Sequence, residues 1–443
     1  MKEAPAWGIE PVPERLRVLG FLDTTLLWGN LGVSLLVIVA GTFLVPALSL
    51  PKALLAILVG ALIGNAMLGL AGLIGADARV PAMVLLRAPL GRRGSYLPTA
   101  LNVIQNLGWA TFELVIIATA AAALSDRAFG FHAKWLWTIV FGAVAGAFAL
   151  LGPIGFVRRW VRRFALWAVL ASLAYLTWWA IDGASLRVLW HQHGTGGLTF
   201  AQGVDLTIAM PVSWLPLVAD YTRFSRGRST AFFGSGLGYL IPNVWLYALG
   251  AVLLLSRDVS DAPNLLTSVA VGGLASAVAL LALTVDETDE PFANIYSTAV
   301  SLQNVVPRAS QRLLIALGAV AATIGALVID LVQYQNFLFL LGSFFVPLFG
   351  VLLADWLLAG AGYSPRDVFQ APALRPELIV AWLCGFALYQ WLLPVGPSWW
   401  TDQVARLGPP STGIGASLPS FGLAFVLTLA AGALARRLAP ARA

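Results

Sequence analysis

Long apolar stretches follow one another along the chain, separated by short polar segments. A helix that crosses a bilayer needs about 20 mostly apolar residues, because lipid offers no partner to unpaired backbone groups. Such stretches lie at 22–46, 53–75, 97–124, 135–151, 162–181, 204–219, 231–255, 265–283 continuing to about 303, 312–329, 332–358, 377–395 and 417–438. The pattern predicts an all-α membrane protein with about 12 transmembrane helices.

Composition supports the same class. Of 443 residues, 59% are hydrophobic and 11% are charged. Soluble domains carry about 25% charged residues, so this chain has too few charges to cover a water-facing surface of its size. The single cysteine, Cys384, excludes an intramolecular disulfide and a zinc or iron–sulfur cluster of cysteines.

The basic residues predict the orientation. With the N-terminus inside, most of the 27 Lys and Arg fall in cytoplasmic segments, as is typical of inner-membrane proteins. We therefore expect a multi-pass protein of the plasma (inner) membrane with both termini cytoplasmic. The polar residues before the first stretch argue against a cleaved signal peptide. Because topology explains the arginine clusters, no nucleic-acid partner is expected.

Two stretches are interrupted at corresponding places. The first contains Gly29, Gly32 and Ser34, and the sixth contains Pro211 and Pro216. Proline removes a helical hydrogen bond, although glycine and proline are also common in membrane helices generally. Each interrupted stretch opens a block of five, and the two blocks have opposite orientation. This arrangement favours a five-plus-five inverted repeat, in which broken helices indicate a transporter binding site.

The repeat predicts three parts of the chain. Residues 1–21 form a cytoplasmic N-terminal segment, and residues 22–358 form a ten-helix transport core. Residues 359–443 hold two additional transmembrane helices and a cytoplasmic tail.

Glu113 is a candidate binding residue because it lies in the middle of an apolar stretch, one helical turn after Trp109. The spacing of four residues puts the indole and the carboxyl group on one helix face. An aromatic ring beside a hydrogen-bonding carboxyl group suits a flat heterocycle. The alternative is a glutamate buried against a polar neighbour for packing alone.

The eighth stretch contains the acids Asp286, Glu287, Asp289 and Glu290 around Thr288. These residues form either a solvated loop between two shorter helices or a discontinuous helix in a water-filled cavity. In the second case, carboxylate, hydroxyl and backbone carbonyl oxygens could bind a small cation.

Three motifs resemble the nucleobase:cation symporter-1 family. They are GIEPVPERLRVLGFLDTTLLWGNLG at the first helix, APLGRRGSYLPTALNVIQNLGW at the third and ADYTRFSR at the end of the sixth. The similarity runs from about Gly8 to Arg312. Within the family, MPVSWLPLVADYTRFSR and NIYSTAVSLQN are most similar to the branch assigned to hydroxymethylpyrimidine, the thiamin precursor, followed by cytosine permease.

The resemblance implies a LeuT-type fold and secondary active transport of purines, pyrimidines, hydantoins or related vitamins. It implies that the substrate lies between aromatic residues of the third and sixth helices. Trp109 matches the first of these, and Trp214 is the nearest aromatic residue to the second. The polar positions of the family match Glu113 and Asn294.

The resemblance also implies a cation site. Its hydroxyl positions match Thr288 and Asp289, and the carboxylate at the second position leaves Na⁺ and H⁺ both open as the coupling ion. The first helix, around Gly32 and Ser34, is expected opposite this site. No other metal and no cofactor are expected.

These observations predict a cation-coupled importer of a pyrimidine-like molecule, with hydroxymethylpyrimidine or cytosine first. Alternatives are another nucleobase, a hydantoin- or allantoin-type substrate, or a substrate-gated channel or receptor on the same fold. An enzyme is not expected, because no stretch carries a nucleophile–base pair or a cluster of metal ligands. The sequence predicts no particular oligomeric state.

Overall fold

The computed structural model describes residues 9–151, 155–257, 259, 261–302, 304–306, 308–408, 410 and 413–438, with the side chains of 151, 155–166, 262, 263, 289, 300 and 435–438 outside the description. Throughout this part of the chain the regular elements are helices, which confirms the all-α class. Their bounds are η1 Glu14–Leu16, α1 Phe21–Leu31, α2 Leu35–Thr42, α3 Leu50–Ala78, α4 Ala82–Leu85, α5 Arg87–Leu90, α6 Tyr96–Phe129, α7 Lys134–Leu151, α8 Gly155–Ile181, α9 Leu186–His191, α10 Phe200–Val212, α11 Leu215–Thr222, α12 Arg228–Ser256, α13 Ala262–Val271, α14 Leu274–Asp286, α15 Asp289–Leu302, α16 Gln311–Val328, η2 Leu331–Gln333, α17 Tyr334–Leu358, α18 Pro365–Phe369, α19 Pro376–Leu392, α20 Ser398–Ala405 and α21 Ser417–Leu438.

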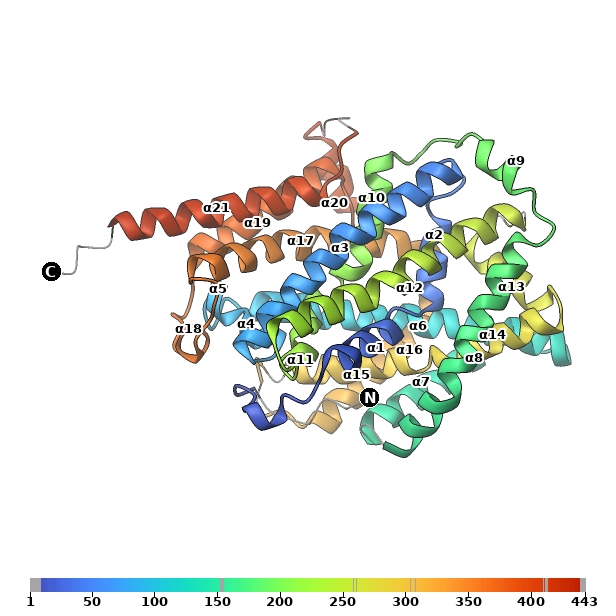
Figure 1. Ribbon diagram of the computed structural model, residues 1–443, viewed down its shortest axis with the longest axis horizontal. Coiled ribbons are helices and arrows are strands. Elements are labelled where there is room, and N and C mark those ends of the chain that lie inside the picture. Colours follow the sequence, from blue (N-terminus) through green and yellow to red (C-terminus); the bar gives the residue numbers. More distant parts are fainter. Residues whose placement is uncertain are drawn as a thin grey trace.

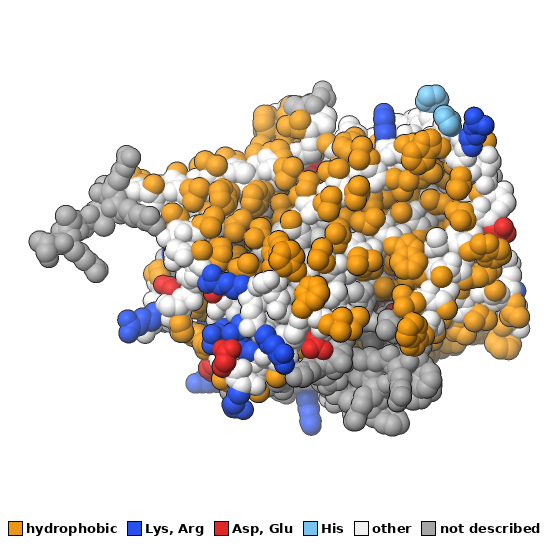
Figure 2. Space-filling model, in the orientation of Figure 1, with side chains coloured by type: hydrophobic (Ala, Val, Ile, Leu, Met, Phe, Trp, Pro, Cys, Tyr) orange, Lys and Arg blue, Asp and Glu red, His pale blue; other side chains and the backbone are white. Residues whose placement is uncertain are grey.

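Several helices can cross a membrane. Among the described residues, six are long and apolar enough, and the bent pair α1 and α2 makes a seventh. Shorter apolar helices lie within α7, α8 and α19, so the count of twelve spans stays a prediction. Hydrophobic side chains cover most of the face in Figure 2, and Lys and Arg gather at its lower left, where Figure 1 shows α4, α5, α11 and α18.

The first predicted stretch is a broken span, here called span one, made of α1 and α2. The two helices meet at an angle of 59°. The residue after α1 is Gly32, and α2 begins after Ser34, whose side chain accepts a hydrogen bond from Leu36 N at 3.1 Å. Ser34 is thus a typical N-cap, and its hydrogen bond starts a new helix in a new direction.

The sixth stretch is broken as well. Span six consists of α10, which contains Pro211, and α11, which has Pro216 in its first turn. Ser213 and Trp214 form the link. Proline is tolerated in a first turn because the N–H groups there lack helical partners, so the second proline favours a restart of the helix after the link.

The eighth stretch was expected to form one element from residue 265 to about 303, but the structure divides it into α13, α14 and α15. The chain turns at Gly272 and Gly273, the latter at a φ of 147°, so that α13 is separate from α14. Glycine adopts such a positive φ without steric cost. The pattern of apolar residues does not reveal this break between α13 and α14. A second link, Glu287 and Thr288, divides span eight into α14 and α15.

Two groups of helices contain spans one and six and the helices that face them. The first group comprises α1, α2, α3, α10, α11 and α12, and the second comprises α6, α7, α15 and α16. Small residues allow close approach within the first group. A Cβ atom on Gly41 would lie 2.0 Å from the carbonyl oxygen of Tyr247, so α2 and α12 touch through their backbones.

The last two long helices, α19 and α21, pack beside α17 at one edge of the molecule (Figure 1). The buried carboxylate of Asp205 in α10 accepts hydrogen bonds from Ala416 N at 2.6 Å and Ser417 N at 3.1 Å. Because these are N–H groups at the start of α21, a carboxylate of span six caps that helix. The division at residue 358 stays a prediction.

Candidate functional site

Span one is held at its break by Glu287. The Ser34 hydroxyl donates to Glu287 Oε1, and Leu35 N donates to Oε2, both at 2.7 Å. Glu287 lies in the link between α14 and α15 and is 2% exposed. Helix N-termini attract anions through their free N–H groups and the helix dipole. The start of α2 is therefore fixed by a carboxylate of span eight.

A second buried carboxylate lies between α6 and α15. Asn294 Nδ2 donates to Glu113 Oε1 at 2.8 Å, and each residue is 3% exposed. The other carboxylate oxygen, Glu113 Oε2, is buried without a partner among the described residues. The two helices thus join at a polar pair that has hydrogen-bonding capacity left.

Within the described part of the chain, neither Glu113 nor Glu287 forms an ion pair with a basic side chain. Removing a carboxylate from water is costly unless a cation or a proton balances the charge. A buried region with two carboxylates is therefore suited to take up a cation.

Trp109 lies on the same face of α6 and contacts aromatic residues of the segment around η2 and α17. Its ring centroid is 5.8 Å from that of Tyr334 and 5.5 Å from that of Phe337, with the planes steeply inclined. Phe112 packs on the same two rings. These edge-to-face contacts fix the position of the Trp109 indole. Neither Tyr334 nor Phe337 stacks in parallel on a face of the indole ring.

The link of span six is also aromatic. Trp214 Nε1 donates to Tyr239 OH at 3.0 Å, and its ring meets the ring of Trp28 edge-on with centroids 5.7 Å apart. Gln105 of α6 donates from Nε2 to the carbonyl oxygen of Ser213 at 2.7 Å. An amide of the second group thus holds the break of a span in the first group.

Further polar contacts join α6 to α15 and to the turn that follows α15, on one side of the Glu113–Asn294 pair. Asn102 Nδ2 donates to Ser301 Oγ, and Asn304 Nδ2 donates to Thr99 Oγ1, both at 3.0 Å. All these residues are buried. Such contacts hold membrane helices together where lipid supplies no hydrophobic drive.

The predicted substrate residues lie in two places. Glu113 and Asn294 are hydrogen-bonded, and Trp109 is on the same helix face. Trp214 belongs to the Trp28 and Tyr239 cluster, and among the described rings it has no contact with Trp109.

The predicted cation residues lie close to a carboxylate that spacing alone did not select. Ser34 contacts span eight through Glu287. Gly32 lies against Pro242 of α12, where an added Cβ would be 2.4 Å from Cγ. The Thr288 hydroxyl donates to Val285 O at 2.7 Å. Asp289 begins α15, and its side chain lies outside the described residues.

Two residues of the site were missed. Glu287 is one of four neighbouring acids, and the interrupted helix leaves no periodicity to show which one faces inward. Gln105 could have been noticed, because it is a polar residue inside the third apolar stretch. Its partner is a backbone carbonyl, however, and no sequence pattern predicts that contact.

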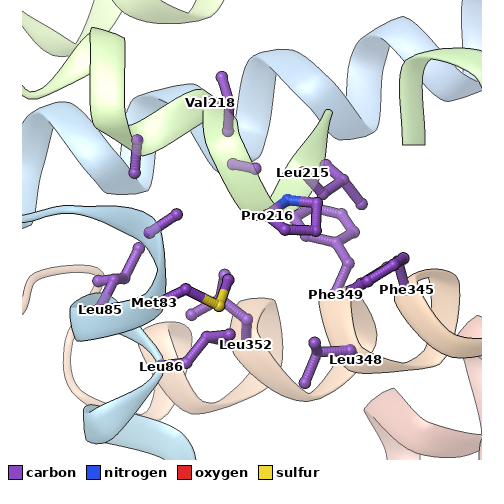
Figure 3. Close-up of a pocket in the computed structure, with 13 residues that line it drawn as sticks. Met83, Leu85, Leu86, Leu215, Pro216, Val218, Phe345, Leu348, Phe349 and Leu352 are labelled. Atoms are coloured by element: carbon purple, nitrogen blue, oxygen red, sulfur yellow. The ribbon is translucent and has the colours of Figure 1, made fainter. Parts of the chain in front are cut away.

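Two cavities lie elsewhere. A cavity of about 20 Å³ between α4, α11 and α17 is lined by apolar side chains such as Met83, Pro216 and Phe349 (Figure 3). It has room for about one water, and none of the side chains that line it is polar. It therefore lacks the convergent polar groups typical of a site for a polar heterocycle.

A larger cavity, of about 510 Å³, is lined by α17, α18 and the loops on either side of α18, with one residue each from α5 and α21. Asp355 there accepts hydrogen bonds from Arg375 Nη1 at 2.8 Å and Tyr363 OH at 2.7 Å. Burial and the adjacent carboxylate raise the pKa of Tyr363 well above its usual range. No predicted site residue lines this cavity.

Comparison with known proteins agrees with this architecture. Residues 11–403 match the family described as permease for cytosine/purines, uracil, thiamine, allantoin. Cytosine permease of Escherichia coli (strain K12) is 25% identical over 350 residues, which cover 76% of this chain and 78% of that protein. Hydantoin permease of Microbacterium maritypicum is 26% identical over 298 residues, covering 62% and 60%.

The fold is shared with solved structures of Mhp1. The inward-facing conformation superposes with a TM-score of 0.80 at 18% identity, covering 98% of this chain and 96% of that one. A closed conformation with bromovinylhydantoin bound gives 0.77 at 19% identity, with the same coverage.

The family that matches residues 11–403 is one of permeases, so the chain is a membrane transporter and not an enzyme. The family match extends over most of the chain. The chain belongs to the cytosine/purine, uracil, thiamine and allantoin permease family, the nucleobase:cation symporter-1 family.

Proposed function

We propose that the protein is a cation-coupled importer of a pyrimidine-like molecule, with hydroxymethylpyrimidine or cytosine as the substrate. The observation that carries this proposal is the buried Glu113–Asn294 pair beside Trp109, with one carboxylate oxygen unused. A carboxylate accepts hydrogen bonds from an exocyclic amino group. The indole supplies a flat surface for the ring, and Trp214 completes the aromatic set.

The coupling cation, Na⁺ or H⁺, is proposed to act where span one meets span eight. Ser34 and the backbone around Gly32 supply oxygen atoms on one side, and Thr288 and Asp289 belong to the other. The carboxylate of Glu287 bridges the two spans in the structure. A cation bound here would change the contact that holds the two groups of helices together, which is the physical basis of coupling.

The proposed setting is the inner membrane, with both termini and residues 1–21 on the cytoplasmic side. The core of residues 22–358 carries the site, and residues 359–443 add two helices and the tail. The relative named for hydantoin and the Mhp1 structure with bromovinylhydantoin favour a hydantoin as the second candidate substrate.

A binding screen tests the substrate. Purified protein is titrated with hydroxymethylpyrimidine, cytosine, uracil, adenine, guanine and hydantoins. We expect the amino-substituted pyrimidines to bind most tightly. Preferential binding of a hydantoin would replace the substrate assignment, and binding of none of these compounds would contradict the proposed function.

A further inference from the structure

The cavity of about 510 Å³ lies at the membrane boundary and contains none of the proposed substrate residues. Its wall includes Asp355 and Leu358 from the end of α17 and Gly432 from near the end of α21. Residues Leu331–Leu358 and Ser417–Leu434 have the length and composition of membrane spans, so the cavity lies where two spans end. The orientation predicted from the basic residues puts this end on the cytoplasmic side.

The loop that forms most of the wall, between α17 and α19, is tied to α5 and to the turn that follows it. Arg92 N donates to Pro372 O at 2.9 Å. Arg375 N donates to Leu90 O at 3.1 Å, and Arg375 Nη1 donates to Ala88 O at 3.0 Å. The backbone of the loop is thus held in place from a distant segment, and the cavity is a built feature of the fold.

The two carboxylates of the wall already have partners within the protein. Asp355 accepts hydrogen bonds from Arg375 Nη1 at 2.8 Å and from Tyr363 OH at 2.7 Å. Asp367 Oδ2 accepts from the backbone N and the hydroxyl of Ser364, each at 2.7 Å. These acids therefore do not depend on a bound cation for their hydrogen bonds.

The basic side chains of the wall, in contrast, keep unused donors. Arg366 of α18 is exposed, and it forms no ion pair or side-chain hydrogen bond within the described part of the chain. Arg375 uses only Nε and Nη1 in its described side-chain contacts, so its Nη2 is a further donor group. Gln370 adds a side-chain amide. A cavity whose carboxylates are occupied and whose guanidinium groups are not is suited to an anion.

The position of the cavity indicates which anion. Guanidinium groups bind phosphate through paired N–H donors, and basic pockets between helices at the cytoplasmic boundary bind the headgroups of anionic lipids. The volume is that of a small-molecule site and exceeds the size of a phosphate ion. Apolar side chains flank the cavity on the two spans, since Leu357 of α17 is 45% exposed and Leu434 of α21 is 57% exposed. An acyl chain can pack there.

We propose that this cavity binds the phosphate group of an anionic phospholipid of the cytoplasmic leaflet, with Arg366 as the main contact and Gln370 and Arg375 beside it. The bound lipid lies between span ten and α21, with its headgroup in the cavity and its acyl chains along the two helices. The proposal is independent of which heterocycle the protein transports.

Native mass spectrometry of the purified, detergent-solubilised protein tests this proposal. Binding of dioleoyl phosphatidylglycerol, which is anionic, is compared with binding of dioleoyl phosphatidylcholine, which has no net charge. We expect wild-type protein to prefer phosphatidylglycerol. Arg366→Gln should weaken binding of phosphatidylglycerol by about tenfold or more, because a hydrogen bond to a charged group is lost, and should leave phosphatidylcholine binding unchanged. Arg366→Lys keeps the charge and should keep part of the preference.

Arg312→Gln is the matched control. Arg312 is an exposed arginine in the first turn of α16, on the same predicted side of the membrane, and it does not line the cavity. Its substitution changes the net charge by the same amount and should not alter lipid binding. Thermal unfolding checks that Arg366→Gln is folded. Its melting temperature without added lipid should equal that of the wild type, because no internal contact is removed.

Two results would overturn the role of Arg366. One is equal binding of phosphatidylglycerol by wild type and folded Arg366→Gln, and the other is an equal loss in Arg312→Gln, which would indicate a general effect of charge. A third arm uses inorganic phosphate alone. If phosphate binds to the wild type but not to Arg366→Gln, and displaces phosphatidylglycerol at millimolar concentration, the anion comes from solution and the lipid is overturned as its source.

Discussion

The two broken spans are held by different chemistry. The break of span one is fixed by the carboxylate of Glu287 from span eight, and that of span six by the neutral amide of Gln105 from α6, the third span. In a five-plus-five repeat, spans one and six correspond, as do spans three and eight. Related positions in the two halves thus hold a charged contact in one and a neutral contact in the other.

Because the two breaks are held by different contacts, they are suited to different functions. A cation or proton changes the strength of a contact made by a carboxylate but leaves a neutral amide contact almost unaffected. The break of span one is therefore suited to respond to the coupling ion. The break of span six carries Trp214 and is suited to position an aromatic side chain.

The largest expected effect is on coupling. Glu287→Gln keeps the shape of the side chain but removes the charge at the N-terminus of α2. We expect gradient-driven accumulation in proteoliposomes to fall to the external concentration, while equilibrium binding is partly kept. Asp286→Asn, in the same acidic stretch, is the control and should still accumulate substrate. Full, gradient-dependent accumulation by Glu287→Gln would remove the charged break from the mechanism.

Asp289→Asn belongs in the same experiment, because the family position of Asp289 predicts uncoupling there too. Uptake is measured across Na⁺ gradients and pH gradients separately. Loss of coupling in Asp289→Asn with normal coupling in Glu287→Gln would assign the cation to the sequence-predicted residue.

The second-largest expected effect is a loss of substrate affinity when the Trp109 ring is removed. Trp109→Ala should weaken substrate binding by about 10- to 100-fold, because stacking of a base on an aromatic ring contributes about 1–3 kcal/mol. Calorimetry measures the change, and thermal unfolding confirms that the variant is folded. Trp399→Ala, an exposed tryptophan of α20, serves as the control. Equal affinity in wild type and Trp109→Ala would exclude stacking.

Glu113→Gln should change selectivity more than affinity. The new amide can still accept from Asn294 through its oxygen, and it presents a donor where Oε2 was. The preference should move from cytosine towards uracil, whose oxo group accepts, by about tenfold. Competition binding with cytosine and uracil measures this change in preference. An unchanged cytosine to uracil ratio would show that Glu113 does not contact the ring.

The smallest effect concerns the neutral break. Gln105→Leu removes one hydrogen bond to Ser213 O, and the expected loss of substrate affinity is about fivefold. At saturating substrate, accumulation should still follow the ion gradient, in contrast to Glu287→Gln. Gln105→Asn, with a shorter amide, should not restore affinity fully. If Gln105→Leu abolished coupling, the two breaks would not have separate tasks.

The sequence predicted the all-α class and the interruptions of spans one, six and eight, because glycine, proline and acidic residues weaken or break a helix inside an apolar stretch. It also placed Trp109 and Glu113 on one face, since helical spacing determines that. Asn294 came from the family motif alone, because the contact with Glu113 joins residues 181 positions apart.

What the sequence did not predict depends on contacts between distant segments. Glu287 stands among acids of equal chemistry, and only the approach of the link between α14 and α15 to span one selects it. The start of α14 depends on the backbone conformation of Gly273, which has no periodic signal. Trp214 was expected beside the substrate, and its contacts with Trp28 and Tyr239 became visible only in the fold.

The most direct measurement is uptake of labelled cytosine and labelled hydroxymethylpyrimidine by the purified protein in liposomes with an imposed Na⁺ or H⁺ gradient. We expect accumulation of one of these compounds above its external concentration, and an ionophore that dissipates the gradient should abolish that accumulation. Entry that stops at the external concentration, whatever gradient is imposed, would contradict cation coupling and indicate a channel.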